Sequence, residues 1–303
     1  MKKRIFKIVS FVVTCFVLIY VPIFAIGQAK NHEIYTEQNV ETKIYTIWHV
    51  ETFEGGSAPR INYLKKIARS LEKTHAGTLF LIKQIEAEKL NESLKESVPD
   101  IISFGFGVGK VVLPYLTELN TCFGVRNELV EASLFNNKVY ALPYIASGYA
   151  LITNGILTQN LHYGLTGYTH PENACENLNL QQSEDETQYK AYKSFVYGKD
   201  VTLFGTARDV FRVENLNKVG RKNASITPNS EYTDLLQYVG ITKTDETIKE
   251  FLTAMFDDKT QQTLADFGLF GVKNTKIYNS GIYDEMENAI FACQIAKVFD
   301  EQN

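Results

Sequence analysis

The stretch from Val139 to Asn154, VYALPYIASGYALITN, constrains the fold more than any other part of the chain. Two short runs of β-forming residues flank a small step at Ile145-Ala146-Ser147-Gly148, which predicts a strand, a joint and a second strand. Pro143 lacks a backbone donor and so excludes a central strand, while Gly148 admits backbone angles closed to other residues. The pattern suits a crossing between two lobes, although spacing alone favours an ordinary bend inside one domain.

The amino-terminal half alternates strands with helices. Lys43 to Trp48 has the alternation of a strand, and the loop Glu54-Gly55-Gly56-Ser57-Ala58-Pro59 leads into a helical pattern from Ile61 to Leu71. Further strands are expected at Leu79–Ile82 and Ile101–Phe104. This alternation predicts an α/β fold.

Glycines in these loops have two interpretations. Gly55 and Gly56 either let backbone N–H groups approach a ligand or only make the tight turn. The later run Phe104-Gly105-Phe106-Gly107-Val108-Gly109-Lys110 is not a phosphate loop, because Val111 stands where Ser or Thr is required. We therefore expect no nucleotide and no cofactor.

The second half begins with a stretch that has no clear periodicity. Residues 155–188 match no zinc or EF-hand template and are interpreted as a solvated linker. A helix is expected at Gln188–Gly198 and a strand at Val201–Phe204. Two further helical patterns follow, at Thr247–Leu264 and from Met286 to Val298, the last packed against the second lobe.

Five blocks in register resemble the bacterial extracellular solute-binding proteins, the receptors of ABC importers, in the branch that mostly carries sugars and oligosaccharides. Besides the joint, they are IWHVETFEGGSAPRINYLKKIARSLEK, SVPDIISFGFG, AYKSFVYGKDVTLFGTARDVFR and FDDKTQQTLADFGLFGVKN. The resemblance implies a two-lobed periplasmic-binding-protein-like fold of type II with a shortened second lobe. Its bounds would be 43–144 and 235–271 for lobe 1, and 145–234 and 272–303 for lobe 2. Tyr232 to Ile241 resembles the family's return crossing.

The resemblance also implies a ligand site between the lobes, with no catalytic residues and no metal. Trp48 at a strand end would stack on the solute, and the planar fork of Arg208 would bind hydroxyls or a carboxylate. Core packing of Trp48 and a purely structural Arg208–Asp209 pair remain alternatives. The expected ligand-binding residues are Trp48, Glu51, Gly55, Gly56, Arg60, Phe104, Gly105, Tyr144, Tyr149 and Arg208.

The amino terminus has the pattern of an export signal. Four bases in residues 2–7 precede an apolar run from Ile8 to Ile26, and residues 30–42 form a polar tether. Residues 1–29 are either a cleaved signal peptide, favoured by Pro22 and the small residues Gly27 and Ala29, or an uncleaved anchor. We expect an extracellular or cell-surface location.

The net charge and the spacing of the cysteines exclude some classes of function. Without the four bases of that segment, 27 Lys and Arg stand against 35 Asp and Glu, a net charge of −8, which disfavours nucleic acids and anionic membranes alike. Cys122, Cys175 and Cys293 contain no CxxC pair; one disulfide would be compatible, with no readable pairing.

Three functions fit these observations. The first is a monomeric receptor that closes on a small solute, a sugar or oligosaccharide, and delivers it to an ABC permease in the membrane. The second is a degenerate receptor that acts as a sensor or partner-binding module. The third is a secreted glycosidase, for which Glu51 and Glu54, on one loop, are a weak carboxylate pair.

Overall fold

The computed structural model describes residues 42–53, 58–154, 160–164, 167–178, 181–185, 187–198, 201–279 and 281–300. The chain divides into two compact units, Met1–Lys43 and Ile44–Asn303, and the fold described here is that of the second. The predicted export segment, nearly all of the tether and the Gly55-Gly56 loop lie outside the described residues. No helix in the described ranges combines the length and apolarity needed to cross a bilayer.

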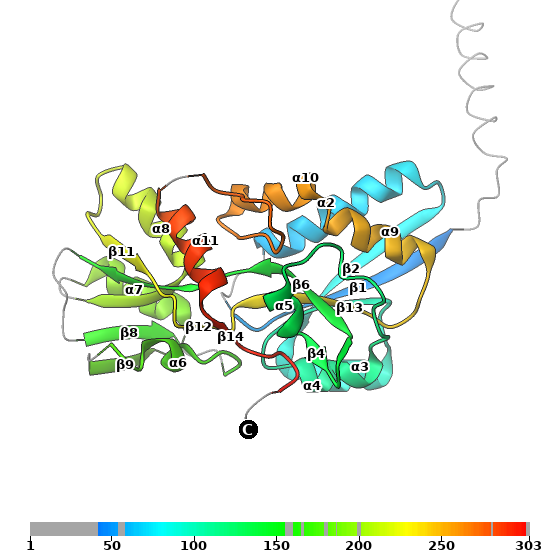
Figure 1. The fold of residues 1–303 in the computed structure, drawn as a ribbon, viewed down its shortest axis with the longest axis horizontal. Coiled ribbons are helices and arrows are strands. Elements are labelled where there is room, and N and C mark those ends of the chain that lie inside the picture. Colours follow the sequence, from blue (N-terminus) through cyan, green and yellow to red (C-terminus); the bar gives the residue numbers. More distant parts are fainter. Residues whose placement is uncertain are drawn as a thin grey trace, which may run out of the picture. The chain divides into compact units, whose positions relative to one another are not determined.

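A five-stranded mixed sheet organises the first lobe, in the order β2-β1-β3-β13-β6 (Figure 1). Strands β1 and β3 are parallel, and β13 runs antiparallel to both β3 and β6. The strands are β1 (Lys43–Glu51), β2 (Thr78–Glu86), β3 (Ile101–Gly105), β6 (Ala141–Ala146) and β13 (Leu236–Ile241), with a small hairpin of β4 (Leu134–Phe135) and β5 (Lys138–Val139).

Helices cover this sheet because their apolar positions recur at helical spacing. In α2 (Ala58–Thr74), Leu64, Ile67 and Ala68 are buried, as the sequence predicts. The other helices of this lobe are α3 (Leu90–Glu96), α4 (Gly109–Val112), α5 (Asn127–Glu131), α9 (Glu246–Met255) and α10 (Asp258–Gln262), with 3₁₀ turns η1 (Ala87–Lys89), η2 (Leu113–Tyr115) and η3 (Thr263–Phe267).

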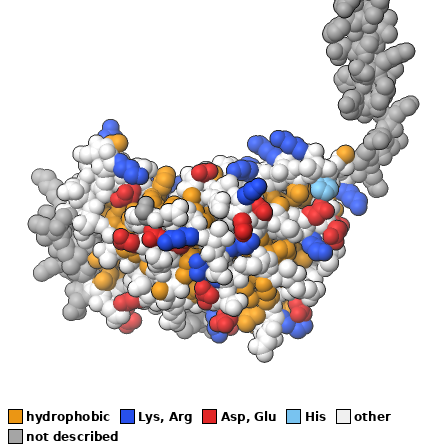
Figure 2. Space-filling view, turned by 45° about the horizontal axis from the view of Figure 1, so that its top comes forward, with side chains coloured by type: hydrophobic (Ala, Val, Ile, Leu, Met, Phe, Trp, Pro, Cys, Tyr) orange, Lys and Arg blue, Asp and Glu red, His pale blue; other side chains and the backbone are white. Residues whose placement is uncertain are grey.

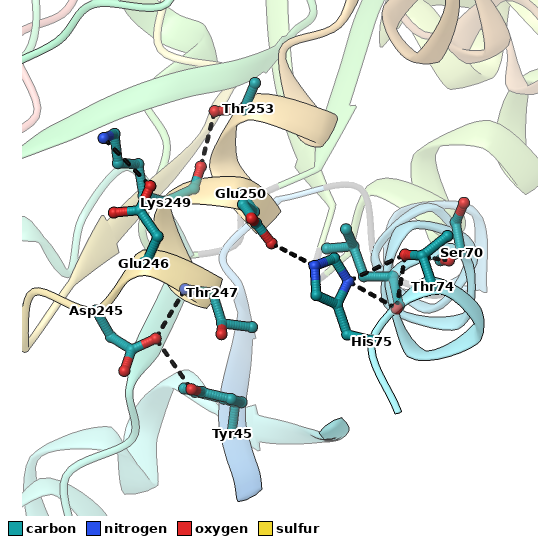
Figure 3. A network of polar contacts seen from close by, with 11 residues as sticks. Tyr45, Ser70, Thr74, His75, Asp245, Glu246, Thr247, Lys249, Glu250 and Thr253 are labelled. Atoms are coloured by element: carbon teal, nitrogen blue, oxygen red, sulfur yellow. Dashed lines mark hydrogen bonds and ion pairs between the residues drawn. The ribbon is translucent and has the colours of Figure 1, made fainter. Parts of the chain in front are cut away.

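Polar contacts join α2, α9 and β1 at the edge of this lobe (Figure 3). The Asp245 carboxylate caps α9 by accepting the Thr247 N–H at 2.8 Å, and the same oxygen accepts the Tyr45 hydroxyl at 2.9 Å. At the end of α2, His75 Nε2 lies 2.8 Å from a Glu250 carboxylate oxygen on α9.

The second lobe is built on another five-stranded mixed sheet, in the order β11-β7-β10-β8-β9. Its strands are β7 (Tyr149–Thr153), β8 (Asn160–Gly164), β9 (Gln181–Asp185), β10 (Thr202–Thr206) and β11 (Ser225–Pro228). Its helices are α6 (Pro171–Cys175), α7 (Gln188–Tyr197), α8 (Ala207–Lys218) and α11 (Gly281–Ala292), and a two-stranded ribbon pairs β12 (Tyr232–Thr233) with β14 (Gln294–Ile295).

The linker predicted for residues 155–188 is wrong. Strands β8 and β9 pair in parallel and extend the second sheet, and α6 lies between them in the chain. Leu161, Tyr163, Ala174 and Cys175 are buried in a small separate core. Apolar positions in these short elements are too few to produce a periodic signal, so only long-range packing defines them.

The chain passes between the two sheets at Ser147-Gly148, where β6 ends and β7 begins. Pro143 lies in β6, an edge strand, where a missing backbone donor is tolerated. The reason for Gly148 differs from the predicted one: its φ is not in the left-handed region, but an added Cβ would lie only 2.6 Å from Ile290 Cγ1 of α11. Close packing, rather than an unusual backbone angle, requires glycine there.

The carboxyl-terminal helix begins and ends earlier than the predicted range from Met286 to Val298, and the chain then leaves the second lobe. Helix α11 ends at Ala292, and the Val298 N–H donates to the Ala132 carbonyl at 3.0 Å. The Phe299 ring packs 6.5 Å from Phe104 and 6.2 Å from Phe135, both in the first lobe. The last described residues therefore connect the second lobe to the first by packing against the first-lobe core.

Candidate functional site

A cavity of about 650 Å³ is lined by residues from both lobes. The first lobe contributes the carboxyl ends of β1 and β2 and the turn η1, while the second contributes the starts of α7 and α8. Strand ends of an open α/β sheet are where side chains and backbone groups remain available for a ligand. The described lining residues are Glu51, Thr52, Phe53, Gln84, Ile85, Glu86, Ala87, Glu88, Tyr168, Thr187, Gln188, Tyr189, Thr206, Arg208, Asp209 and Arg212.

Arg60 fixes the first-lobe wall at the end of β1. Its guanidinium donates to the Phe53 carbonyl at 2.5 Å, lies 4.3 Å from the centre of the Phe53 ring, and lies 3.4 Å from a Glu51 carboxylate oxygen. Glu51 also accepts the Gln84 amide at 3.5 Å. The Arg60 side chain is almost fully buried, so the pair holds Glu51 and Phe53 in position at the cavity.

A buried hydrogen-bond network extends from Glu51 into the first-lobe core. His49 Nε2 lies 3.4 Å from Glu51 and His49 Nδ1 lies 2.9 Å from the Ser103 hydroxyl. Ser103 contacts the Tyr144 hydroxyl at 2.9 Å and accepts the Gln237 amide at 2.9 Å. Burial lowers the pKa of His49, outweighing the opposing effect of its contact with Glu51, so the ring is neutral near pH 7.

Thr52 contributes a buried hydroxyl group to this wall. Its Oγ1 is buried and has no hydrogen-bond partner among the described residues. A Cβ on Gly105 would overlap that oxygen, so the glycine leaves room for Thr52. A buried hydroxyl without a partner carries a desolvation cost that a ligand's polar group would relieve.

Asp209 organises the wall contributed by the second lobe. One carboxylate oxygen accepts the Gln188 amide at 2.6 Å and the Thr206 N–H at 3.2 Å, and the other accepts Arg212 at 3.2 Å. Thr206 and Asp209 form a capping box at the start of α8. The side-chain oxygen of Gln188, Oε1, in turn accepts the Gly164 N–H at 3.2 Å. This carboxylate thereby fixes the first turns of α7 and α8 to each other.

Arginines and tyrosines extend this wall. The Arg212 guanidinium lies 5.7 Å from the Tyr189 ring centre and 5.1 Å from that of Tyr192, and the two rings stack at 6.3 Å. A smaller cavity of about 240 Å³ shares Arg208 and Arg212 with the main one. Its other described lining residues are Arg60, Phe211, Asp266, Phe267 and Leu269.

Tyr168 connects the two walls. Its hydroxyl donates a hydrogen bond to the Glu88 carboxylate of the first lobe, and burial together with that carboxylate raises the Tyr168 pKa. Gly107 has a φ of 90°, and a Cβ there would lie 2.8 Å from Tyr168 Cβ. The backbone of the first lobe thus approaches the tyrosine of the second closely.

The ten ligand-binding residues predicted from the sequence do not all lie at the cavity. Glu51 and Arg208 line the main cavity and Arg60 lies directly behind it. Gly105 supports Thr52, and Gly55 and Gly56 lie outside the described residues. The four predicted aromatic contacts, Trp48, Phe104, Tyr144 and Tyr149, are all less than a tenth exposed and are not among the described lining residues.

Sequence reasoning missed most of the lining. Gln84 to Glu86 end strand β2, and Ala87 and Glu88 begin the turn η1, so they occupy a strand end of the kind used for Trp48. Arg212 lies four residues after Arg208 on one helix face and could have been found from that spacing. Tyr168 carried no signal, because it falls in the stretch interpreted as a linker.

Comparisons with known proteins support the fold and leave the family open. No protein-family model matches the sequence, and no curated protein is detectably related to it. Solved structures do match. The GacH receptor of Streptomyces glaucescens, determined unliganded and with acarbose, is 11% identical, with a TM-score of 0.61 over 84% of this chain and 87% of that chain.

Two further structures show the range of functions that accompany this fold. The cyclic α-maltosyl-1,6-maltose binding protein of Arthrobacter globiformis is 10% identical, with a TM-score of 0.58 over 86% of this chain and 89% of that one. Thiaminase I of Bacillus thiaminolyticus is also 10% identical, with a TM-score of 0.57 over 84% and 94%. The chain has the α/β fold of type II periplasmic binding proteins. The solved structures that match it are mostly binding proteins, and they include an enzyme.

Proposed function

We propose that the protein is an extracellular solute-binding receptor of an ABC importer, which captures a small hydroxyl-rich solute, a sugar or an oligosaccharide, in the cavity between its lobes. The observation that carries the proposal is that one cavity of about 650 Å³ takes its walls from two separate sheets. A solute that contacts both walls would stabilise the closed arrangement of the lobes, which is the receptor's mode of action.

The chemistry of the cavity supports a sugar. Arg208 and Arg212 provide donors, and the Glu51 carboxylate provides acceptors, as a ring of hydroxyl groups requires. The rings of Phe53, Tyr168 and Tyr189 lie in the same lining and offer apolar faces for the C–H surface of a sugar. The sugar-binding structures that share the fold agree with this choice.

The other parts of the proposal concern the chain around the cavity. We take lobe 1 as 43–144 and 235–271 and lobe 2 as 145–234 and 272–303, adjusted so that β6 keeps Ala146 and the residues around Phe299 belong to lobe 1, with rotation at Ser147-Gly148. The protein would be exported by residues 1–29, act as a monomer without a cofactor or catalytic activity, and deliver its solute to a membrane permease. Intact-mass measurement of the exported protein tests the first step: a mature form beginning near Lys30 is expected, and a species retaining Met1 would indicate an anchor.

A thermal-shift screen tests the binding function. The panel contains mono- and oligosaccharides, amino acids and peptides, and a ligand at 100 times its Kd adds about 2.7 kcal/mol to the free energy of unfolding. Saccharides are expected to shift the melting temperature. Arg208→Ala should weaken their affinity by about 1–3 kcal/mol, since it leaves ligand hydroxyls without a donor.

The matched control is Arg69→Ala, which removes the same charge from an exposed position on α2 outside the cavity lining. Its affinity should equal that of the wild type. A screen without any shift would support the degenerate, partner-binding alternative. Conversion of a bound saccharide, followed by NMR, would show an enzyme instead.

A further inference from the structure

Helix α2 carries a row of cations on its exposed face. Lys65, Lys66, Arg69 and Lys73, here called the α2 stripe, are all exposed and line one shallow surface hollow together with Asn62 and Ser70. At about 100° per residue the four side chains fall within a sector of about 100°, and about 12 Å of helix separates the first from the last. Figure 2 shows Lys and Arg side chains gathered at the upper edge of the described part, over α2.

The stripe lacks compensating carboxylates. Among the described residues, none of its four members takes part in an ion pair. The acidic residue within α2, Glu72, accepts the Phe80 N–H at 2.8 Å on the side facing β2. At the carboxyl end of the helix, Glu250 pairs with His75 (Figure 3). Four like charges placed side by side without partners repel one another, which favours an external anionic partner.

We propose that the α2 stripe is a docking surface for the phosphate headgroups of an anionic bilayer. Clusters of four to eight Lys and Arg are the recognised means of adsorbing to anionic lipid, at roughly 1 kcal/mol or fivefold in partitioning for each charge. The inference does not depend on the proposed solute. It concerns how the receptor sits at the surface to which its amino-terminal segment, residues 1–29, is predicted to direct it.

The composition of the face favours a bilayer over a protein partner. Protein interfaces are depleted in Lys and enriched in aromatic residues at their centres. From Arg60 onward, where the exposure of α2 is described, its exposed side chains are all polar, among them Asn62, Ser70 and Thr74, so this part of the face has no apolar centre to bury. The sequence predicts that the net charge, −4 for the whole chain and −8 without its four amino-terminal bases, disfavours anionic membranes. Screening confines each charge to about 10 Å at 0.1 M salt, so the α2 stripe is felt locally apart from that net charge.

The experiment uses the full chain with vesicles of phosphatidylcholine, alone or mixed with phosphatidylglycerol. Lysines are acetylated with a water-soluble reagent and the rate at each lysine is read by mass spectrometry. The three lysines of the stripe are expected to react at least about fivefold more slowly with the anionic vesicles only. Lys95, Lys218 and Lys259, exposed lysines outside the stripe, are internal controls and should be unaffected. Because each rate belongs to one residue, insertion of the amino-terminal segment does not obscure the result.

Two further arms sharpen the result. At about 1 M salt the screening length is about 3 Å and the protection should disappear. Replacing the three stripe lysines, Lys65, Lys66 and Lys73, with Gln should reduce anion-dependent vesicle binding at least about tenfold. The matched variant Lys95→Gln, Lys218→Gln and Lys259→Gln should retain that binding. Equal acetylation of the stripe on both kinds of vesicle, or equal losses in the two variants, would overturn the proposal.

Discussion

The Tyr149 hydroxyl donates a hydrogen bond of 2.8 Å to the buried Asp234 carboxylate. The two residues stand beside the two points at which the chain passes between its sheets, after Gly148 and before Leu236. Asp234 also accepts the His170 N–H at 2.6 Å and the Tyr232 hydroxyl at 3.3 Å. Burial raises the pKa of Asp234 although these donors oppose the shift. A tyrosine predicted to bind ligand thus belongs to the crossing itself.

Tyr149→Phe is expected to lower the free energy of unfolding by about 1.5–3 kcal/mol, the range for a hydrogen bond to a charged group. Urea unfolding followed by circular dichroism measures it. The control is Tyr232→Phe, which removes the longer hydrogen bond to the same carboxylate and should cost less. Equal losses of unfolding free energy in the two variants would mean that the Tyr149 hydrogen bond stabilises the fold no more than the Tyr232 one does.

Trp48→Ala is expected to destabilise the protein by about 3–5 kcal/mol, because the ring is only 6% exposed within the first-lobe core. The sequence predicts a different result, a loss of solute affinity without unfolding. Urea unfolding and ligand titration on the same variant separate the two. Trp48→Phe, which retains most of the buried area, should lose much less stability; a reduced affinity with unchanged stability would restore the ligand role.

Asp209→Ala is expected to cost about 3–5 kcal/mol, since it removes the cap of α8 and leaves the Gln188 amide and Arg212 without their shared acceptor. Thermal unfolding provides the measurement. Asp300→Ala, an exposed carboxylate near the end of the chain, should change stability by less than about 0.5 kcal/mol. A small effect at Asp209 would show that α7 and α8 do not depend on it.

His49 predicts a dependence of stability on pH. Burial holds the pKa of His49 in the folded protein below its ordinary value of 6.5, so the unfolded chain binds more protons between the two values. The stabilising effect of the neutral ring is therefore complete above pH 6.5 and is lost as the pH falls towards the folded pKa. Unfolding free energies measured from pH 8 to pH 5 should decline more steeply for the wild type than for His49→Gln; parallel profiles would exclude His49 as the cause.

Gly148→Ala is expected to be destabilising by about 1–3 kcal/mol, because the new methyl group would press on Ile290 Cγ1. Ile290→Ala removes the obstructing atom at the cost of a cavity. In the double variant the two effects should not add, and unfolding measurements of the full cycle give the coupling energy. Additive effects would show that the close approach is not maintained in solution.

Local patterns made much of the fold predictable. Leu64, Ile67 and Ala68 recur at helical spacing, and the sequence placed α2 and β3 nearly where they lie. Periodicity shows which residues face a core, but it does not show which end of a buried side chain meets solvent. For this reason Trp48, at a strand end, was assigned to the ligand although neighbouring elements cover it.

The candidate site was only partly predictable, because its walls meet through long-range packing. Glu51 and Arg208 were found from strand ends and a motif, and both line the cavity. Tyr168 and Glu88 are 80 residues apart in the chain, and no local pattern indicates that they touch. Asp209 was recognised only as a neighbour of Arg208, whereas its contacts with Gln188 and Arg212 depend on how α7 packs on α8.

The strand order of the first sheet bears on how the chain acquires its structure during synthesis. Strand β13 lies between β3 and β6, so the first sheet lacks an interior strand until residue 241 has emerged, whereas the second sheet is contained in residues 149–228. Until then β3 and β6 each present an unpaired edge, which is a template for wrong pairing between chains. The lobe that is made first is therefore the one that finishes last, and its unpaired strand edges stay exposed for longer.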